Sequence, residues 1–216
     1  EDIEQLVASN KSLMPEGFEK QMQPQEFVDL LEFLTARGRF VPLDLSKVAT
    51  ITSARGMFFD TEANLERLIF PDWEPKEFQG VPFRVIDPEG GRVRNVILLH
   101  GPQGRFPPTM PRHVELPCNM PAKTIHMLGG VSGWGFPYGE KGSVSLVVRL
   151  HYADGQSEEH ALKNGEHFAD YIREVDVPGS KRAFNLRGRQ VRYLTVEPGR
   201  KDAIREIEID ALFLAA

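Results

Sequence analysis

The sequence has little cysteine, no long apolar run and no excess of positive charge. Cys118 is the single cysteine, which excludes an internal disulfide. No apolar run reaches the roughly 18 residues that a membrane-spanning helix needs. The formal net charge of −5 disfavours nucleic acid, whose partners usually present a strongly basic face. We therefore expect no membrane span and no nucleic-acid partner, and we expect Cys118 to be a buried structural side chain.

Common catalytic and metal-binding motifs are also missing. The six histidines lie far apart and form neither His-x-His nor His-Glu-x-x-His. Gly-x-Ser-x-Gly, the motif of a nucleophile elbow, does not occur. Carboxylates are plentiful, but a sequence does not reveal which two would face each other as in a glycosidase. We therefore predict that the chain is not an enzyme, and that His126 and His151 are hydrogen-bonded structural residues within strands.

What the sequence does contain is an acidic, helical beginning. Residues 1–41 carry eight Asp or Glu against four Lys or Arg. Pro24 suits the first turn of a helix, where its missing N–H is not needed. Apolar residues then recur at i, i+3, i+4 and i+7 from Phe27 to Leu34, which places them on one helix face. Because Gly38 can end such a helix, the pattern predicts a helix over Pro24–Arg37.

After Pro42 the pattern changes to short apolar or alternating runs separated by turn residues. Such spacing is typical of an all-β sandwich or barrel. Asp154-Gly155 predicts a hairpin turn, and Asn164-Gly165 predicts a second one. The last run predicts a long closing strand with a bulge or kink. The expected strands are 48–52, 82–86, 93–100, 113–116, 124–128, 143–152, 158–162, 191–196 and 204–214.

Residues 12–34, SLMPEGFEKQMQPQEFVDLLEFL, resemble the closing segment of the cytochrome c-like domains found in large planctomycete-type proteins. In that family a Met-Pro loop supplies the sixth iron ligand, which here implies Met14, with Met22 as the second candidate. A thioether ligand favours Fe(II) over Fe(III) and so raises the reduction potential of the haem. No Cys-x-x-Cys-His occurs in the chain, so we expect no haem in this chain and haem c in a longer parent protein. The alternative is that Met14 is an ordinary loop or core methionine.

The remainder of the chain is similar to carbohydrate-binding modules of the galactose-binding-like jelly-roll type, which follow such cytochrome domains. This resemblance implies a jelly-roll β-sandwich with a short N-terminal α-helical segment, and a periplasmic or extracellular location. It divides the chain into a cytochrome-like end (1–38), a linker with an edge strand that wraps the sandwich (39–80) and the sandwich itself (81–216). The resemblance is carried by residues 49–58, 80–83, 125–137, 149–155 and 164–171.

The glycine-rich stretch Gly129–Gly142 is the strongest candidate for a ligand site. Trp134, Phe136 and Tyr138 alternate within it between two expected strands. Flat aromatic faces suit the C–H face of a sugar ring, and glycines let a backbone approach a ligand closely. The alternative is that these aromatic side chains cap one end of the core.

Two further groups of residues are candidates for binding. Residues 179–201 contain seven Lys or Arg against one Glu, and Arg187 and Arg189 in this stretch offer guanidinium groups to acidic sugars or an acidic protein partner. The alternative is a scattered, solvated surface. The resemblance also implies a structural calcium ion, for which Asp87, with Glu89 or Asp60, supplies suitable oxygen ligands.

We expect a non-catalytic module that binds a carbohydrate or polysaccharide within a multidomain haem-containing redox protein. The first alternative is a structural or docking module that holds the upstream domains of the same polypeptide and binds no free ligand. The second is a glycan-active hydrolase, which would require two carboxylates that share a cleft.

The resemblance to a cytochrome end predicts what precedes Glu1. We expect a Cys-x-x-Cys-His motif within roughly a hundred residues upstream, because that motif attaches the haem. Sequencing the gene upstream of the first codon tests this expectation. An upstream region without the motif would remove the assignment of Met14 as an iron ligand.

Overall fold

The computed structural model describes Gln23 and residues 40–132, 135–172 and 174–211. The described strands belong to one compact unit, Pro42–Ala216. The helix predicted over Pro24–Arg37, and Met14 with it, lie outside the described residues, as do most residues of the predicted cytochrome-like end. The domain boundaries at 38 and 80 therefore stay predictions.

The described part of the chain is mainly β, with antiparallel strand pairing throughout its named strands. One sheet has the order β3-β9-β5-β6 and a second has the order β4-β8-β7, while β1 and β2 form a separate hairpin. Helical structure is limited to short 3₁₀ turns at Asn64–Glu66, Glu89–Gly91 and Pro107–Thr109. The strands are β1 (Lys76–Phe78), β2 (Val81–Phe83), β3 (His113–Met120), β4 (Ile125–Gly129), β5 (Val144–Tyr152), β6 (Ser157–Lys163), β7 (Lys181–Leu186), β8 (Arg189–Val196) and β9 (Ile204–Asp210).

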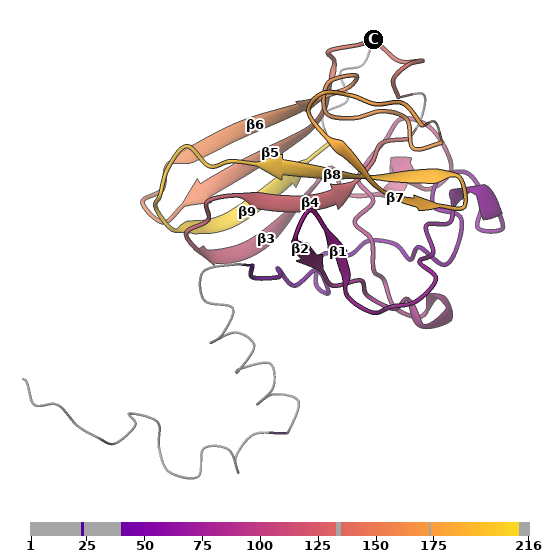
Figure 1. Cartoon of the computed structure of the whole chain (residues 1–216), viewed down its shortest axis with the longest axis horizontal. Coiled ribbons are helices and arrows are strands. Elements are labelled where there is room, and N and C mark those ends of the chain that lie inside the picture. The colour runs from indigo at the N-terminus through magenta and orange to yellow at the C-terminus, as the bar shows by residue number, and fades with distance from the viewer. Residues whose placement is uncertain (1–22, 24–39, 133–134, 173, 212–216) are drawn as a thin grey trace, which may run out of the picture. The chain divides into compact units, whose positions relative to one another are not determined.

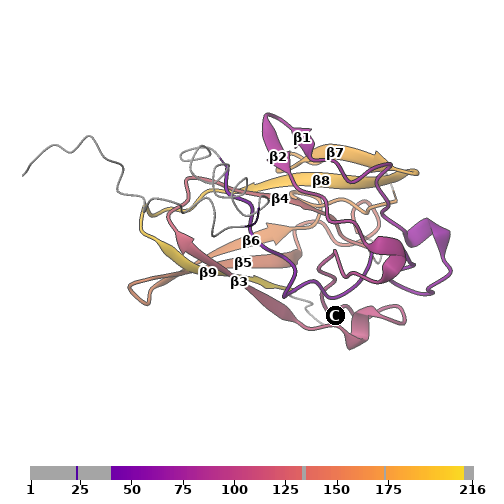
Figure 2. The same cartoon turned by 90° about the horizontal axis from the view of Figure 1, so that it is seen from below.

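The two larger sheets lie in two layers with the core between them (Figures 1 and 2). Strand β5 is central: Val148, Leu150 and Tyr152 alternate along it, and none of the three is accessible to solvent. They pack with buried side chains from both sheets, so the sheets share one core. The other strands contribute Leu116, Cys118, Leu162, Leu194, Val196, Ile204 and Ile207 to that core.

Cys118 is buried, with 7% of its surface exposed, which confirms its predicted structural role. Burial raises the pKa of its thiol, and its Sγ lies 3.7 Å from the Met120 carbonyl oxygen. A raised pKa keeps the thiol protonated and unreactive.

The bulge predicted in the closing strand is present in β9. The register with β5 runs regularly until His151 pairs with Glu206, and then Tyr152 pairs with Ile204, so Arg205 is the extra residue. The bulge lets Ile204 and Ile207 both face the core although they are three residues apart. The predicted continuation of this strand to Leu214 runs beyond the described residues.

Several other sequence predictions are also decided. The Asp154-Gly155 hairpin joins β5 to β6 as predicted, whereas Asn164-Gly165 begins a turn that joins no hairpin. The strand predicted over 93–100 is wrong, since it forms only a single bridge, between Ile51 and Val96. The Thr50 side chain ends the ladder there, because its hydroxyl bonds both Leu98 N, at 2.7 Å, and Leu98 O, at 2.8 Å.

The strands β1 and β7 were not predicted. The β1–β2 hairpin lies against the outer face of the three-stranded sheet (Figure 2). There, the Phe78 and Tyr193 rings are tilted against each other with their centroids 5.2 Å apart. The Phe184 ring of β7 has its centroid 6.2 Å from that of Phe78 and 5.4 Å from that of Phe70. A hairpin this short is only marginally stable by itself. The aromatic cluster stabilises it, since aromatic pairs contribute about 0.5–1.5 kcal/mol each.

The shared core predicts a strong effect at its centre. Leu150→Ala should lower the free energy of unfolding by about 2–5 kcal/mol, because Leu150 has no exposed surface and its loss leaves a cavity. Leu65→Ala is the matched control, since 68% of Leu65 is exposed and a change within about 0.5 kcal/mol is expected. Urea unfolding followed by tryptophan fluorescence measures both. Equal effects of the two variants would contradict the placement of the core.

Candidate functional site

Four connections meet at one end of the sandwich, where β4 and β6 end and β8 begins. The β4–β5 connection contacts the segment after β6, because the Tyr171 N–H donates to Val131 O at 3.0 Å. The Phe58 and Tyr171 rings, 5.2 Å apart, add the segment before β1. Arg189 Nε donates to Leu65 O at 2.6 Å and so ties the start of β8, beside the β7–β8 turn, to that segment. We call these four segments the loop end; its described residues are 56–66, 130–132 with 135–143, 164–172 and 187–188.

Two buried polar side chains hold the β4–β5 connection in place. Asn164 accepts the Phe136 N–H at 2.8 Å and donates to Glu140 O at 3.0 Å. Asp170 accepts the Gly135 N–H at 3.0 Å. Only 5% of Asn164 and 3% of Asp170 is exposed, so these hydrogen bonds are shielded from water. The connection is therefore positioned by the sandwich rather than by a ligand.

Glycine is required at two positions of this arrangement. A Cβ on Gly135 would lie 3.1 Å from the Asp170 backbone nitrogen and 3.0 Å from Val131 Cγ2. Gly165 has a φ of +72°, and a Cβ there would lie 2.9 Å from Phe136 Cδ2. The Phe136 ring thus packs closely on the backbone of the Asn164-Gly165 turn.

The predicted aromatic residues have different environments. Phe136 is half-buried, and its ring lies against Gly165. Tyr138 is 49% exposed, and its backbone N–H donates to Gly135 O at 2.9 Å. Trp134 lies outside the described residues. Of the two described aromatic side chains, Tyr138 therefore presents the larger surface to a ligand.

The two predicted arginines lie at the β7–β8 turn of the same loop end. Arg187 is exposed and occupies the first turn position with a φ of +55°, followed by Gly188 at +77°, as in a type I′ hairpin. Arg189 is partly buried and committed to Leu65 O and Gly188 O. Of the two, Arg187 alone has an exposed side chain, so the two guanidinium groups do not form one joint binding site.

The prediction that residues 179–201 form a solvated basic face is wrong at Arg192, which has no exposed surface. Its guanidinium donates to Ser180 Oγ at 2.6 Å, Ser180 O at 3.1 Å, Val175 O at 3.0 Å and Gln190 Oε1 at 2.8 Å. All four acceptors are uncharged. Burial lowers the pKa of Arg192, and the nearby charge of Asp176 opposes that shift.

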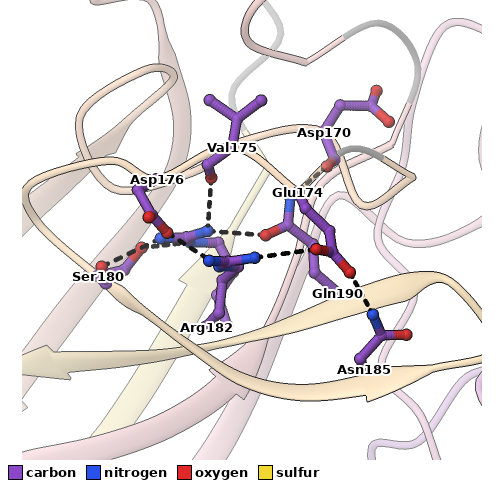
Figure 3. Close-up of polar contacts among 9 residues, drawn as sticks. Asp170, Glu174, Val175, Asp176, Ser180, Arg182, Asn185 and Gln190 are labelled. Atoms are coloured by element: carbon purple, nitrogen blue, oxygen red, sulfur yellow. Dashed lines mark hydrogen bonds and ion pairs between the residues drawn. The ribbon is translucent and has the colours of Figure 1, made fainter.

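Arg192 and Gln190 extend the buried polar set to the other side of the loop end. Gln190 Nε2 donates to Asp170 O at 2.6 Å (Figure 3). Since the Asp170 side chain holds Gly135, a series of hydrogen bonds runs from residues 174–180 to the β4–β5 connection. The sequence pattern does not predict this series of hydrogen bonds, because a stretch as rich in Lys and Arg as the one around Arg192 is usually exposed to solvent.

Glu66 is a buried side chain that holds the backbone of the segment before β1. Only 6% of Glu66 is exposed, and its carboxylate accepts the N–H groups of Phe58 and Phe59 at 2.9 and 3.0 Å. The adjoining Tyr171 has a pKa raised to about 12, mainly by burial and further by the Glu66 charge. Phe59 itself is 56% exposed, so the anchored backbone presents an apolar side chain to solvent.

A second polar network covers the outer face of the four-stranded sheet. Glu208 of β9 accepts from Arg149 Nη1 at 2.5 Å and pairs with His151 Nε2 at 2.9 Å, both from β5. His151 Nδ1 lies 2.9 Å from Ser157 Oγ, and Arg149 also donates to Glu159 at 2.7 Å. The serine, histidine and glutamate are in series, but Arg149 holds the same carboxylate and the group lies on a sheet face, as cross-strand pairs do. We interpret it as a sheet-stabilising network.

The histidine predictions are confirmed at both strand positions. His151 belongs to the network above, and His126 Nδ1 lies 2.7 Å from the Tyr193 hydroxyl. Among residues 40–132, 135–172 and 174–211, no group of three or more His, Cys, Asp or Glu is placed to hold a metal ion. Asp87 instead accepts the N–H of Glu89 at 2.7 Å. The calcium site around Asp87 stays a prediction.

No protein-family model, no curated protein and no solved structure matches this chain. Within the described residues there is no helix with the length and apolar character that a membrane crossing requires.

The network on the outer sheet face predicts a pH-dependent contribution to stability. Burial alone would raise the pKa of Glu208, but the hydrogen bonds and charges of His151 and Arg149 outweigh it and lower the pKa. Glu208→Gln should lower the free energy of unfolding by about 1–3 kcal/mol at pH 7. A carboxyl whose folded-state pKa is lowered stabilises above its ordinary pKa, and that contribution is lost as the pH falls through the lowered value.

Urea unfolding at pH 7 and at about pH 3 tests this sign. The difference between wild type and Glu208→Gln should shrink at the lower pH. Glu159→Gln serves as the control, because its side chain is 60% exposed and a loss below about 1 kcal/mol is expected. A Glu208→Gln effect that stays constant with pH would contradict the role of the ionised carboxylate.

Proposed function

We propose that this chain is a non-catalytic binding module whose ligand surface is the loop end, and that its ligand is a carbohydrate. The observation that carries the proposal is that the β4–β5 connection combines a fixed backbone with an exposed aromatic side chain. Its backbone is fixed by the buried Asn164 and Asp170, while Tyr138 on the same connection is half exposed. A rigid loop that presents an aromatic side chain loses little conformational entropy when it binds.

Physical chemistry favours a saccharide for such a surface. The face of an aromatic ring is apolar and flat, as is the C–H face of a sugar. Arg187 in the neighbouring turn adds an exposed guanidinium for hydroxyl or carboxylate oxygens. Loops on a β-sandwich commonly carry binding function because the scaffold positions them.

The wider context of the proposal comes from the resemblance of the sequence. We assign the sandwich to the galactose-binding-like jelly-roll type, preceded by the helical end of a cytochrome c-like domain. Haem c in the parent protein, Met14 as its ligand and a periplasmic or extracellular location belong to the same proposal. The module would then bring a redox protein to a polysaccharide.

Exposed apolar side chains favour a docking module as the second candidate. Leu65 is 68% exposed, Phe59 56% and Ile172 43%, and all three belong to segments of the loop end. Apolar surface of this kind is enriched where proteins meet other domains. A docking module would hold upstream domains of the same polypeptide and would bind no free glycan.

Substitution of the two aromatic residues Tyr138 and Trp134 tests the carbohydrate proposal. Tyr138→Ala, and separately Trp134→Ala, should weaken binding to a responsive polysaccharide by about tenfold or more, since losing about 1.4 kcal/mol of contact between an aromatic ring and a sugar face lowers the affinity tenfold. The thermal midpoint should not change for Tyr138→Ala, because half of this side chain is already exposed. Affinity electrophoresis with a polysaccharide panel, with and without calcium, measures the binding.

Val41→Ala is the matched control, because it removes part of an exposed apolar side chain that lies outside the loop end. Its polysaccharide affinity should equal that of wild type. If wild type binds none of the glycans, the carbohydrate proposal fails and the docking module takes its place.

A further inference from the structure

A depression lies along β7, which is an edge strand of the three-stranded sheet. Its volume is about 170 Å³, well below that of typical drug-sized ligand pockets. Such a volume suits one small ring rather than a cofactor. The lining residues are Glu174, Arg182, Ala183, Phe184, Asn185 and Gln190.

The polar side chains at this depression are already held in one arrangement (Figure 3). Glu174 uses one carboxylate oxygen to accept from Arg182 Nη1 at 3.2 Å and the other to accept from Asn185 Nδ2. Arg182 Nε donates to Asp176 at 2.9 Å. These ion pairs use Nη1 and Nε of Arg182, a guanidinium carries further N–H donors on Nη2, and a carboxylate can accept more than one hydrogen bond at each oxygen.

Buried groups stand behind this arrangement and make its wall rigid. Gln190, which is 3% exposed, lines the depression and is bonded to Asp170 O and to Arg192. Arg192 in turn holds Val175 O, between the two carboxylates that pair with Arg182. The positions of Glu174 and Asp176 are therefore set from the interior of the sandwich.

The charges at the depression cancel, and this decides the class of ligand. Arg182 and the buried Arg192 carry two positive charges, and Glu174 and Asp176 carry two negative charges. A bare anion or cation would meet an unfavourable partner as well as a favourable one. A hydroxyl group both donates and accepts, so neighbouring hydroxyls can accept from Arg182 Nη2 and donate to Glu174 at the same time.

We infer that the β7 depression binds a single neutral sugar ring through two neighbouring hydroxyls held by Arg182 and Glu174. This inference rests on the proposed carbohydrate-binding function, and it adds a second contact surface that is separate from Tyr138. A polysaccharide chain would then be held at the stacking residue and at the β7 depression.

Titration with methyl glycosides of glucose, galactose, mannose and xylose, followed by ¹H–¹⁵N NMR, tests the inference. We expect the Asn185 side-chain amide and the Arg182 Nε–H signals to shift saturably with one of them. Arg182→Gln and Glu174→Gln should each weaken that binding by about tenfold, because hydrogen bonds to charged groups are the strong ones. Arg200→Gln is the matched control, since Arg200 also bridges two carboxylates, Asp154 and Asp202, away from β7.

The outcomes separate this inference from the proposed function. Binding that Arg182→Gln and Glu174→Gln weaken and Arg200→Gln does not would support the β7 depression, whatever Tyr138→Ala does. Binding that only Tyr138→Ala removes, with no shift of the Asn185 amide, would overturn the depression and leave the loop end as the site. Should wild type respond to no methyl glycoside and to no polysaccharide, both proposals fall.

Discussion

The loop end depends on one requirement, which is that every buried backbone N–H and C=O must find a hydrogen-bond partner. In the sheets the neighbouring strands meet this requirement. In the connections they do not, and polar side chains meet it instead: Asn164, Asp170, Glu66 and Arg192 each bond backbone groups of a segment far away in the sequence or across a turn. Removing one of them would leave several groups without partners at once.

Arg192 is the most demanding member of this set. A fully buried guanidinium loses its hydration, and here it regains hydrogen bonds from carbonyl, hydroxyl and amide oxygens rather than from a carboxylate. The carboxylates of Glu174 and Asp176 lie further out and pair with Arg182. The buried charge and the polar lining of the β7 depression are therefore parts of one arrangement.

Strand β5 shows how a single strand serves two environments. Its inward residues form the centre of the core, and its outward residues Arg149 and His151 join β9 and β6 through charged pairs. The edges of the same sheet are protected from pairing with other chains: β3 contains Pro117, and β6 carries Glu158, Glu159 and Lys163.

The pattern of apolar, polar and turn residues along the sequence determined most of the strands. Short apolar or alternating runs predicted β3, β4, β5, β6, β8 and β9, because a strand with one buried face has a period of two. The Asp154-Gly155 pair predicted the turn between β5 and β6. The spacing of Ile204 and Ile207 predicted the bulge. Tertiary structure decided the rest: β7 is a strand although its sequence is basic, because β8 supplies its hydrogen-bond ladder. It also decided that Phe136 packs inward while Tyr138 is exposed, and that Arg192 is buried while Arg187 is not. Those outcomes depend on which distant residues supply hydrogen bonds and space, and neighbours in sequence carry no information about that.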